Sequence, residues 1–411
     1  MMQKQELPSG WRKQKLADLA NVKGGKRLPK GRSLVSENTG YPYIRVTDMH
    51  DGGVSLENVL FIPQDIVAKI SRYRIFTEDI FITVAGTLGV VGEIPQELNG
   101  ANLTENADRI TDINCDKKFL LQVLRSSFIQ GIIKSTQTQN AQPKLAIERI
   151  NTFPILLPPQ PEQKAIADLL STWDEAIEKT ERLIQAKEKR FKQLLNDLIH
   201  QGRSNHTWKG YNLSDLCSPV SRKNGENNTN VLTSSAQNGL VSQIEYYNKS
   251  VSAENVTGYY LLKKGEFAYN RSSAKGYPYG ATKRLDRYEK GVLSTLYLCF
   301  ALKPDAPCES DFLLHLFESG AANRELRAVC QEGARSHGLL NITKADFFGI
   351  KLFLPSQDQQ KKIQSALNTA QNEIALLKQL AEKYKTQKRG LMQKMLTGEW
   401  RVRGFATNDE G

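Results

Sequence analysis

Two stretches of the chain, about residues 162–199 and 356–398, place apolar side chains at alternating steps of three and four positions. This spacing, sustained over several heptads, is typical of a helix that packs along a coiled-coil seam. A helix of roughly 40 residues is about 60 Å long. The predicted seam consists of Ile166, Leu170, Trp173, Ile177, Ile184, Phe191, Leu194, Ile363, Leu367, Ile374, Leu377, Tyr384, Leu391 and Met395.

Polar residues interrupt this seam at Thr180, Lys187 and Lys388. We expect them to weaken the helix pairing while fixing its register. The acidic residues Asp174, Glu175 and Glu178 lie on the first helix and are interpreted as part of its solvated face.

Two blocks, residues 1–158 and 204–355, precede the two helices and are here called the first and second block. Apolar runs alternate in them with polar, glycine-containing segments, a pattern that predicts mixed α/β domains. We expect strands at 43–46, 80–84, 258–262 and 292–300, and short helices at 119–127 and 311–318.

The chain repeats itself at an offset of 197 residues. This offset aligns Trp11 with Trp208 at the start of each block, and it aligns Gln163 with Gln360 at the start of each helix. Inside the blocks the copies diverge, since residues 78–82 resemble 265–269 at an offset of 187. A shared register at both ends of a long unit indicates a duplicated frame around variable interiors.

The repeat predicts an α+β architecture with a pseudo-two-fold axis. It consists of a domain at 1–158, a first long helix at 159–203, a second domain at 204–355, a second long helix at 356–398 and a tail at 399–411. If the helices pair antiparallel, the tail returns towards the first block. We therefore expect two mixed α/β domains separated by two long antiparallel coiled-coil helices.

The net charge of +12 is spread over the repeat, with a basic excess of four charges in each block and of five over residues 355–398. Such a distribution suits a polyanionic partner. The five cysteines are scattered and odd in number, which favours a reducing cytoplasm over a disulfide framework. We find no apolar run long enough to span a membrane and no export signal at the N-terminus.

Several loop segments combine basic, amide and aromatic side chains with glycine. Arg and Lys pair with guanine, Asn and Gln pair with adenine, and glycine permits close backbone approach. As single residues they are equally consistent with solvated surface loops. The candidate DNA-binding residues are Lys23, Lys26, Arg27, Lys30, Arg32, Arg45, Gln139, Asn140, Gln142, Lys144, Arg222, Lys223, Tyr269, Asn270, Arg271, Lys275, Tyr277, Arg335, His337 and Asn341.

Motifs for catalysis are missing from the sequence. The segment Gly24–Arg27 lacks the spacing of a phosphate-binding loop, and Gly86–Gly92 does not fit the dinucleotide fingerprint. The five histidines are dispersed, and no CxxC or HxxxH metal spacing occurs. We therefore expect no catalytic residue, metal or cofactor in this chain.

The segments that open and close the repeat resemble a known family. Residues 8–19, 42–49 and 156–167 in the first copy, and 231–235, 267–272 and 331–342 in the second, look like type I restriction–modification specificity subunits. The resemblance covers nearly the whole chain, except for residues 405–411.

This resemblance implies two target-recognition domains, each reading one half of a split, asymmetric site on double-stranded DNA. Two modification subunits carrying adenine-N6 methyltransferase activity and restriction subunits that translocate and cut DNA would join it. S-adenosylmethionine, ATP and Mg would then belong to those partners.

Two alternatives remain open from the sequence. The chain could serve a related methylation-only or phage-defence system, because that difference lies in the partner proteins. A coiled-coil scaffold without any DNA role is the alternative from another class.

Overall fold

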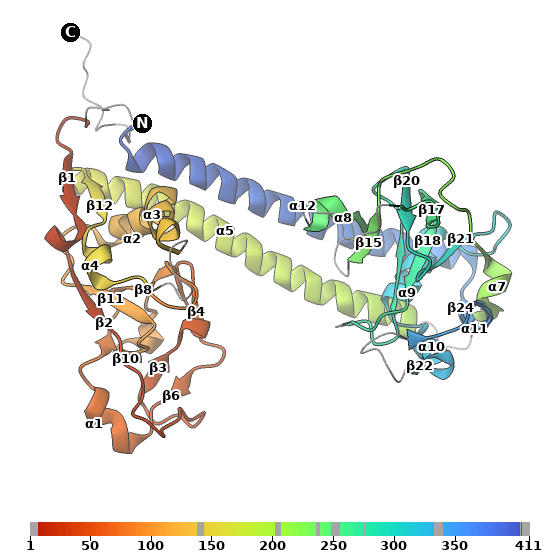
Figure 1. Ribbon diagram of the computed structural model, residues 1–411, viewed down its shortest axis with the longest axis horizontal. Coiled ribbons are helices and arrows are strands. Elements are labelled where there is room, and N and C mark those ends of the chain that lie inside the picture. The colour runs from red at the N-terminus through yellow and green to blue at the C-terminus, as the bar shows by residue number, and fades with distance from the viewer. Residues whose placement is uncertain are drawn as a thin grey trace, which may run out of the picture. The chain divides into compact units, whose positions relative to one another are not determined.

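The computed structural model describes residues 7–137, 144–201, 207–235, 239–247, 255–274, 276–332, 340–402 and 404. The chain divides into two compact units, and each contains one block together with parts of both long helices. The first unit is Met1–Glu181 with Gln379–Gly411, and the second is Arg182–Lys378. Figure 1 shows these elements.

The first block closes by pairing its entrance strand with its exit strand. β1 (Arg12–Lys15) pairs antiparallel with β12 (Pro154–Leu157), which leads into the long helix α5 (Gln160–Leu195). The two ends of the block therefore lie side by side at the start of α5.

Two four-stranded sheets and a hairpin form the interior of the first block. The first sheet has the order β2 (Asn21–Gly24), β11 (Ala107–Thr111), β8 (Ile80–Thr83), β9 (Val91–Glu93). The second has the order β6 (Leu60–Phe61), β3 (Pro42–Ile44), β10 (Ala101–Leu103), β7 (Arg74–Ile75), and the hairpin joins β4 (Met49–His50) to β5 (Gly53–Val54). The helices are η1 (Leu16–Asp18), η2 (Val46–Asp48), η3 (Gln64–Ile66), α1 (Val67–Ile70), η4 (Gln96–Leu98), α2 (Lys117–Arg125), α3 (Ser127–Gln137) and α4 (Ile147–Asn151).

The second block repeats this closure. β13 (Lys209–Asn212) pairs with β24 (Lys351–Leu354). Lys209 lies opposite Leu354, just as Arg12 lies opposite Leu157 in the first block, and each residue of the second pair is 197 positions after its counterpart. A four-stranded sheet follows, with the order β14 (Cys217–Pro219), β21 (Leu298–Leu302), β18 (Phe267–Asn270), β19 (Ala281–Arg284). Two-stranded pairs are formed by β15 (Leu232–Ser235) with β16 (Gly239–Ser242), β17 (Tyr260–Lys263) with β20 (Lys290–Leu293), and β22 (Gln331–Glu332) with β23 (Leu340–Asn341).

Short helices complete the second block, and α9 takes the place of α2. They are α7 (Leu213–Leu216), α8 (Gln243–Tyr247), α9 (Ser310–Glu318), α10 (Asn323–Val329) and α11 (Lys344–Gly349). The strand expected at 292–300 is wrong as a single element, because a turn that joins the Tyr297 amide to the Ser294 carbonyl separates β20 from β21.

The long helices α5 and α12 (Gln357–Leu396) pair antiparallel within each unit (Figure 1). In the first unit Trp173 meets Tyr384 edge to face, with ring centroids 5.8 Å apart. In the second unit Lys187 Nζ lies 2.6 Å from Glu373 Oε1. Residues later in α5 thus contact residues earlier in α12, as in an antiparallel pair. α5 ends in a π-helical turn, Asn196–Gln201.

All predicted seam residues are buried or half-buried. The first unit packs Ile166 and Leu170 against Met392 and Met395 in its main core, and the second packs Leu195 against Leu367. The expected fold class, two mixed α/β domains separated by two long antiparallel helices, is confirmed by these elements.

Candidate nucleic-acid interface

A basic loop follows β2 in the first block, and its start is fixed to the neighbouring sheet. The Gly25 amide donates to Ala107 O at 3.1 Å, and the Lys26 amide donates to Leu103 O at 2.8 Å. A Cβ at position 25 would lie 2.0 Å from Thr104 O, so only glycine fits this approach. The loop therefore projects from an anchored base.

Beyond this anchor the loop bounds a pocket of about 340 Å³. Leu28, Leu34 and Tyr43 contribute apolar surface, and the cationic side chains come from Arg27, Lys30 and Arg32. The Tyr43 hydroxyl donates to Lys26 O at 3.0 Å and holds the loop over the pocket. A basic hollow of this kind suits a phosphate group.

Part of this charge is balanced within the block. Arg27 Nε lies 2.5 Å from Glu105 Oε1, although the Arg27 side chain is 77% exposed, and Arg32 forms an ion pair with Asp65. Lys30 is exposed at the loop tip. The structure thus brings together three of the candidate residues, Arg27, Lys30 and Arg32, around this pocket, while Lys26 Nζ lies 5.8 Å from the ring centroid of Tyr73.

Other candidates of the first block lie elsewhere. Lys23 pairs at 3.2 Å with Asp112, which directly follows the neighbouring strand β11. The Arg45 guanidinium is held by Asp48 and donates to Asn58 O at 2.9 Å, so it orders its own loop. Lys144 is exposed. Gln139, Asn140 and Gln142 lie outside the described residues.

In the second block the basic candidates pair with nearby groups. Arg222 Nη2 donates to both carboxylate oxygens of Glu266, at 2.9 and 2.8 Å. Lys223 Nζ donates to Gly258 O at 2.8 Å and lies 4.6 Å from the ring centroid of Tyr260.

The candidate segment 269–277 serves mainly to build the block. Tyr269 is fully buried, stacks on Phe347 at 4.5 Å and donates its hydroxyl to Tyr279 O. Arg271 Nε donates to Leu296 O at 2.7 Å. Tyr269 is therefore a core residue in this structure, and a base could contact it only if the core opened.

The remaining candidates of this block are divided between its interior, its surface and positions without described structure. The Tyr277 hydroxyl donates to Glu318 Oε2 and accepts from Lys283 Nζ, while the Asn270 Oδ1 accepts from the Ser272 amide. Asn341 is exposed on β23. Lys275, Arg335 and His337 lie outside the described residues.

The cysteines offer no activated nucleophile. Burial raises the pKa of Cys115 to about 11 and the pKa of Cys217 and Cys299 to about 12. Over the part of the chain that the structure describes, no group of three or more His, Cys, Asp or Glu side chains is placed to hold a metal ion. Within the same part, no helix combines the length and the apolar character needed to cross a membrane.

Comparison with known protein families bears on the first repeat. Residues 8–188, from before β1 to within the last two turns of α5, match the type I restriction modification DNA specificity domain. These residues are similar to that domain. The resemblance to type I specificity subunits is thereby confirmed.

Curated relatives of the specificity domain are distant in sequence. The MjaVIII specificity subunit of Methanocaldococcus jannaschii is 25% identical over 203 residues, which are 47% of this chain and 46% of that protein. The EcoBI specificity subunit of Escherichia coli is 25% identical over 178 residues, 42% of this chain and 37% of its own length. The chain thus spans about half the length, or less, of the curated relatives it matches.

Solved structures share the fold over almost the whole chain. A type I restriction-modification S subunit from M. genitalium has a TM-score of 0.56 and 16% identity, and the match covers 96% of this chain and 99% of that one. A chain from a structure of type I system assembly and conformational transition has a TM-score of 0.52 and 12% identity, covering 96% and 100%.

In each repeat one glutamine joins the block to the long helix that follows it. In the specificity domain, Gln163 Nε2 donates to Pro158 O, and its Oε1 accepts from the Asp116 amide at the start of α2. Gln360 repeats both bonds, with Pro355 O and with the Glu309 amide before α9. The 197-residue offset already aligned these glutamines, so the signal was present although their role was not predicted.

The tail completes the specificity domain from the far end of the chain. Glu162 is fully buried, and its Oε2 accepts from Trp11 Nε1 at 3.1 Å. Arg401 Nε and Nη2 donate to the two carboxylate oxygens of Glu162, at 2.9 and 2.7 Å. Arg401 is therefore part of the first unit.

Proposed function

We propose that this chain is the non-catalytic DNA-recognition subunit of a type I restriction–modification complex. Residues 1–158 and 204–355 are the two target-recognition domains, and each reads one half of a bipartite, asymmetric site on duplex DNA. The helices 159–203 and 356–398 are the spacer, and the tail 399–411 returns towards the first domain. Modification subunits with adenine-N6 methyltransferase activity and restriction subunits use this chain as their scaffold.

The observation that carries this proposal is the repetition of the specificity domain's frame. The strand pair that closes the first block recurs in the second with the same register, 197 residues later, and the glutamine contacts recur with it. The interiors differ in sheet composition and loop chemistry. A fixed frame around two different interiors suits the recognition of two different half-sites.

The basic loop of the first block supports the DNA-binding part of the proposal. Its pocket gathers Arg27, Lys30 and Arg32 on a backbone that Gly25 anchors. We assign this loop to contacts with the phosphate backbone, which place a protein on the duplex. Base contacts then come from other loops of the block.

Two measurements test the function. The full chain, purified with its modification subunit, should bind duplex DNA with an affinity that falls as salt rises, because phosphate contacts release counterions. A plot of log K against log salt without slope would overturn the DNA-binding proposal in favour of a scaffold that does not bind DNA.

The second measurement tests the division into two recognition domains. Residues 204–354 are replaced by the second domain of another type I specificity subunit, and methylated sites are then mapped by sequencing. One half of the recognised sequence should change and the other should stay. A change in both halves would contradict the modular assignment.

A further inference from the structure

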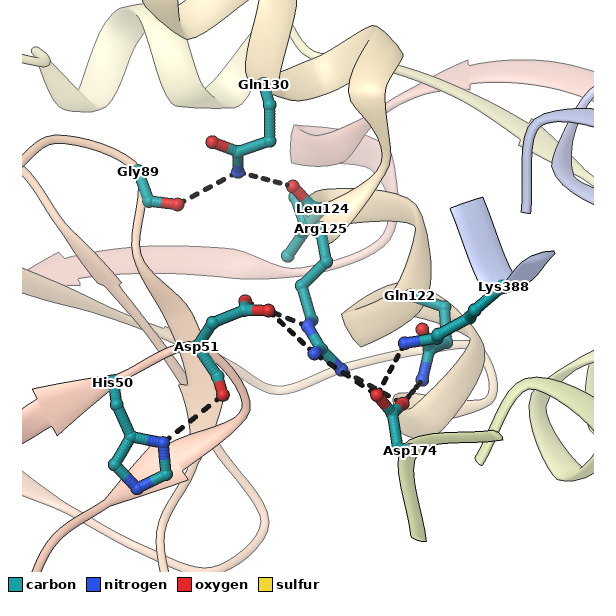
Figure 2. A network of polar contacts seen from close by, with 9 residues as sticks. All are labelled: His50, Asp51, Gly89, Gln122, Leu124, Arg125, Gln130, Asp174 and Lys388. Carbon is teal, nitrogen blue, oxygen red and sulfur yellow. Dashed lines mark hydrogen bonds and ion pairs between the residues drawn. The ribbon is translucent and has the colours of Figure 1, made fainter. Parts of the chain in front are cut away.

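Asp174, on the first half of α5, is the centre of a polar network that sequence analysis interpreted as solvated surface. Its Oδ2 accepts from Gln122 Nε2 at 2.7 Å and from Arg125 Nη1 at 3.1 Å. Its Oδ1 accepts from Lys388 Nζ of α12 at 2.6 Å (Figure 2). One carboxylate therefore joins both long helices to α2 of the first block.

Arg125 extends the network into the interior of the block. Its Nε and Nη2 donate to Asp51 Oδ1 and Oδ2, at 2.9 and 2.7 Å (Figure 2). Asp51 lies in the turn of the β4–β5 hairpin, whose next residue, Gly52, donates its amide to Val91 O of β9. We call Asp51, Gln122, Arg125, Asp174 and Lys388 the Asp174 network.

The hairpin continues into the loop that holds the predicted DNA-binding residue Arg45. The Ser55 amide donates to Asp48 O at 2.8 Å, and the Asp48 carboxylate binds the Arg45 guanidinium. A continuous chain of bonds and short backbone steps thus runs from α12, through α5 and α2, to this loop.

The two cations of the network are buried and its charges balance, whereas the side chains of Asp174 and Asp51 are 30% and 65% exposed. The side chains of Lys388 and Arg125 are 7% and 12% exposed, and they face the carboxylates of Asp174 and Asp51. Burial raises the pKa of Asp174, but Arg125, Lys388 and the hydrogen bonds offset this and leave the pKa lowered. Buried ion pairs contribute little net stability compared with apolar contacts, but they tolerate few geometries. This makes the network better suited to fixing an arrangement than to strengthening it.

The second repeat does without these charges. The offset of 197 residues places Gln371 at the position of Asp174, and Phe191 at the position that corresponds to Lys388. Phe191 packs edge to face on His315 of α9, with centroids 6.4 Å apart. The His315 Nε2 lies 2.7 Å from Asn368 Oδ1. Asn368 Nδ2 also donates to Asp311 Oδ2 of α9 at 2.7 Å. The second block therefore joins the helix pair here through an aromatic contact and hydrogen bonds, so the shared frame does not require the Asp174 network.

We propose that the Asp174 network is a positioning element that fixes the angle between the first block and the helix pair, and so restricts the gap between half-sites that the chain accepts. None of its members need contact DNA. The inference rests on the proposed function, because a gap has meaning only for a bipartite site. It assigns the network a role in specificity that a merely stabilising contact would not have.

The test transplants the residues of the second repeat into the first. The double variant Asp174→Gln/Lys388→Phe replaces the ionic contact by the pair found at the equivalent positions. Arg125→Lys, which keeps the charge but loses the two-pronged guanidinium, is a milder second variant. Lys187→Gln/Glu373→Gln is the control, because it removes an ion pair that joins the same two helices to each other.

The two half-sites are first identified by methylation sequencing. The complex with the modification subunit is then titrated with duplexes in which the half-sites are separated by the native gap, or by one or two base pairs more or fewer. Wild type and control should show a sharp optimum. In the double variant, the ratio of the affinity for the native gap to the affinity for an altered gap should fall about tenfold. Its affinity for duplexes with a single half-site should stay at the wild-type value.

The outcomes separate this inference from the function on which it rests. A gap profile that stays as sharp as wild type in both variants would overturn the positioning role. An equal loss of affinity at every gap, with an unchanged ratio between gaps, would also overturn it and leave the network purely structural. If the wild-type chain shows no preference for any half-site, the proposed function itself fails.

Discussion

Removing the guanidinium of Arg401 should destabilise the first unit. The Glu162 carboxylate is 0% exposed and accepts three hydrogen bonds, two from Arg401 and one from Trp11 Nε1. In Arg401→Met only the indole bond remains, and a buried charge is left without its counter-ion. Such a loss is much more costly than the loss of an exposed ion pair.

The expected size follows from the burial of the pair. Removing one partner of a buried pair costs about 3–5 kcal/mol, and the 15% exposure of the Arg401 side chain leads us to expect about 2–4 kcal/mol. For a unit of this size this corresponds to a fall in Tm of roughly 6–12 °C. The double variant Glu162→Gln/Arg401→Met should recover most of the loss, because glutamine still accepts the indole bond without carrying charge.

Calorimetry and urea unfolding of the full chain measure the effect. Lys361→Met is the matched control: Lys361 Nζ lies 3.8 Å from Glu309 Oε1, the lysine side chain is 60% exposed, and its loss should cost less than about 1 kcal/mol. If Arg401→Met stays within about 0.5 kcal/mol of wild type, or if the double variant is no more stable than the single one, the Glu162 pair does not hold the tail.

Three further predictions concern the basic loop, the glycines and the cysteines. Lys30→Gln should weaken binding to all duplexes similarly and reduce the salt slope by about one, while Lys179→Gln, on the exposed face of α5, should change neither; an unaltered slope in Lys30→Gln would remove the loop from the interface. Gly92→Ala should cost about 1–3 kcal/mol in urea unfolding, because its Cβ would lie 2.5 Å from Gly53 N, whereas Gly390→Ala in the open face of α12 should add about 0.5–1 kcal/mol; equal effects would refute the packing at Gly92. Cys115, Cys217 and Cys299, with pKa values raised from 9.0 to about 11, about 12 and about 12, should react slowly with DTNB at pH 8 in the native chain and rapidly in urea. Their contribution to stability is fully present below pH 9.0, the pKa of the unfolded thiols, and is lost as the pH rises towards the native values, so a native chain that reacts at the unfolded rate would contradict their burial.

The frame of the molecule could be predicted from the sequence because it is written twice. The heptad spacing predicted two long helices, and the structure has α5 and α12 close to the expected bounds. The 197-residue offset of Trp11 and Trp208 and of Gln163 and Gln360 marks the closing strand pairs and the junctions that recur in both units. Periodicity and repetition extend over many residues, so single residues that depart from the pattern do not hide them.

The interiors of the blocks were less predictable, because their residues act through partners far away in sequence. Tyr269 carries the chemistry of a base-stacking residue, but its position in β18 directs the ring onto Phe347 in the core. Asp174 lies in an acidic stretch of a helix, which normally faces solvent, yet its partners are 49 and 214 residues away in the chain. The continuous apolar run 292–300 conceals the turn between β20 and β21. No local pattern carries this information.

The first unit also has a consequence for how the chain is made. Its main core contains Trp11 and Leu16 from the beginning of the chain together with Met392, Met395 and Leu396 from near the end, whereas the second unit is one uninterrupted stretch, Arg182–Lys378. During synthesis from the N-terminus, all residues of the second unit are therefore present while the core of the first still lacks the residues from the end of α12. The half that is translated first is finished last, and a ribosome that stops early releases a chain whose first domain has an open core.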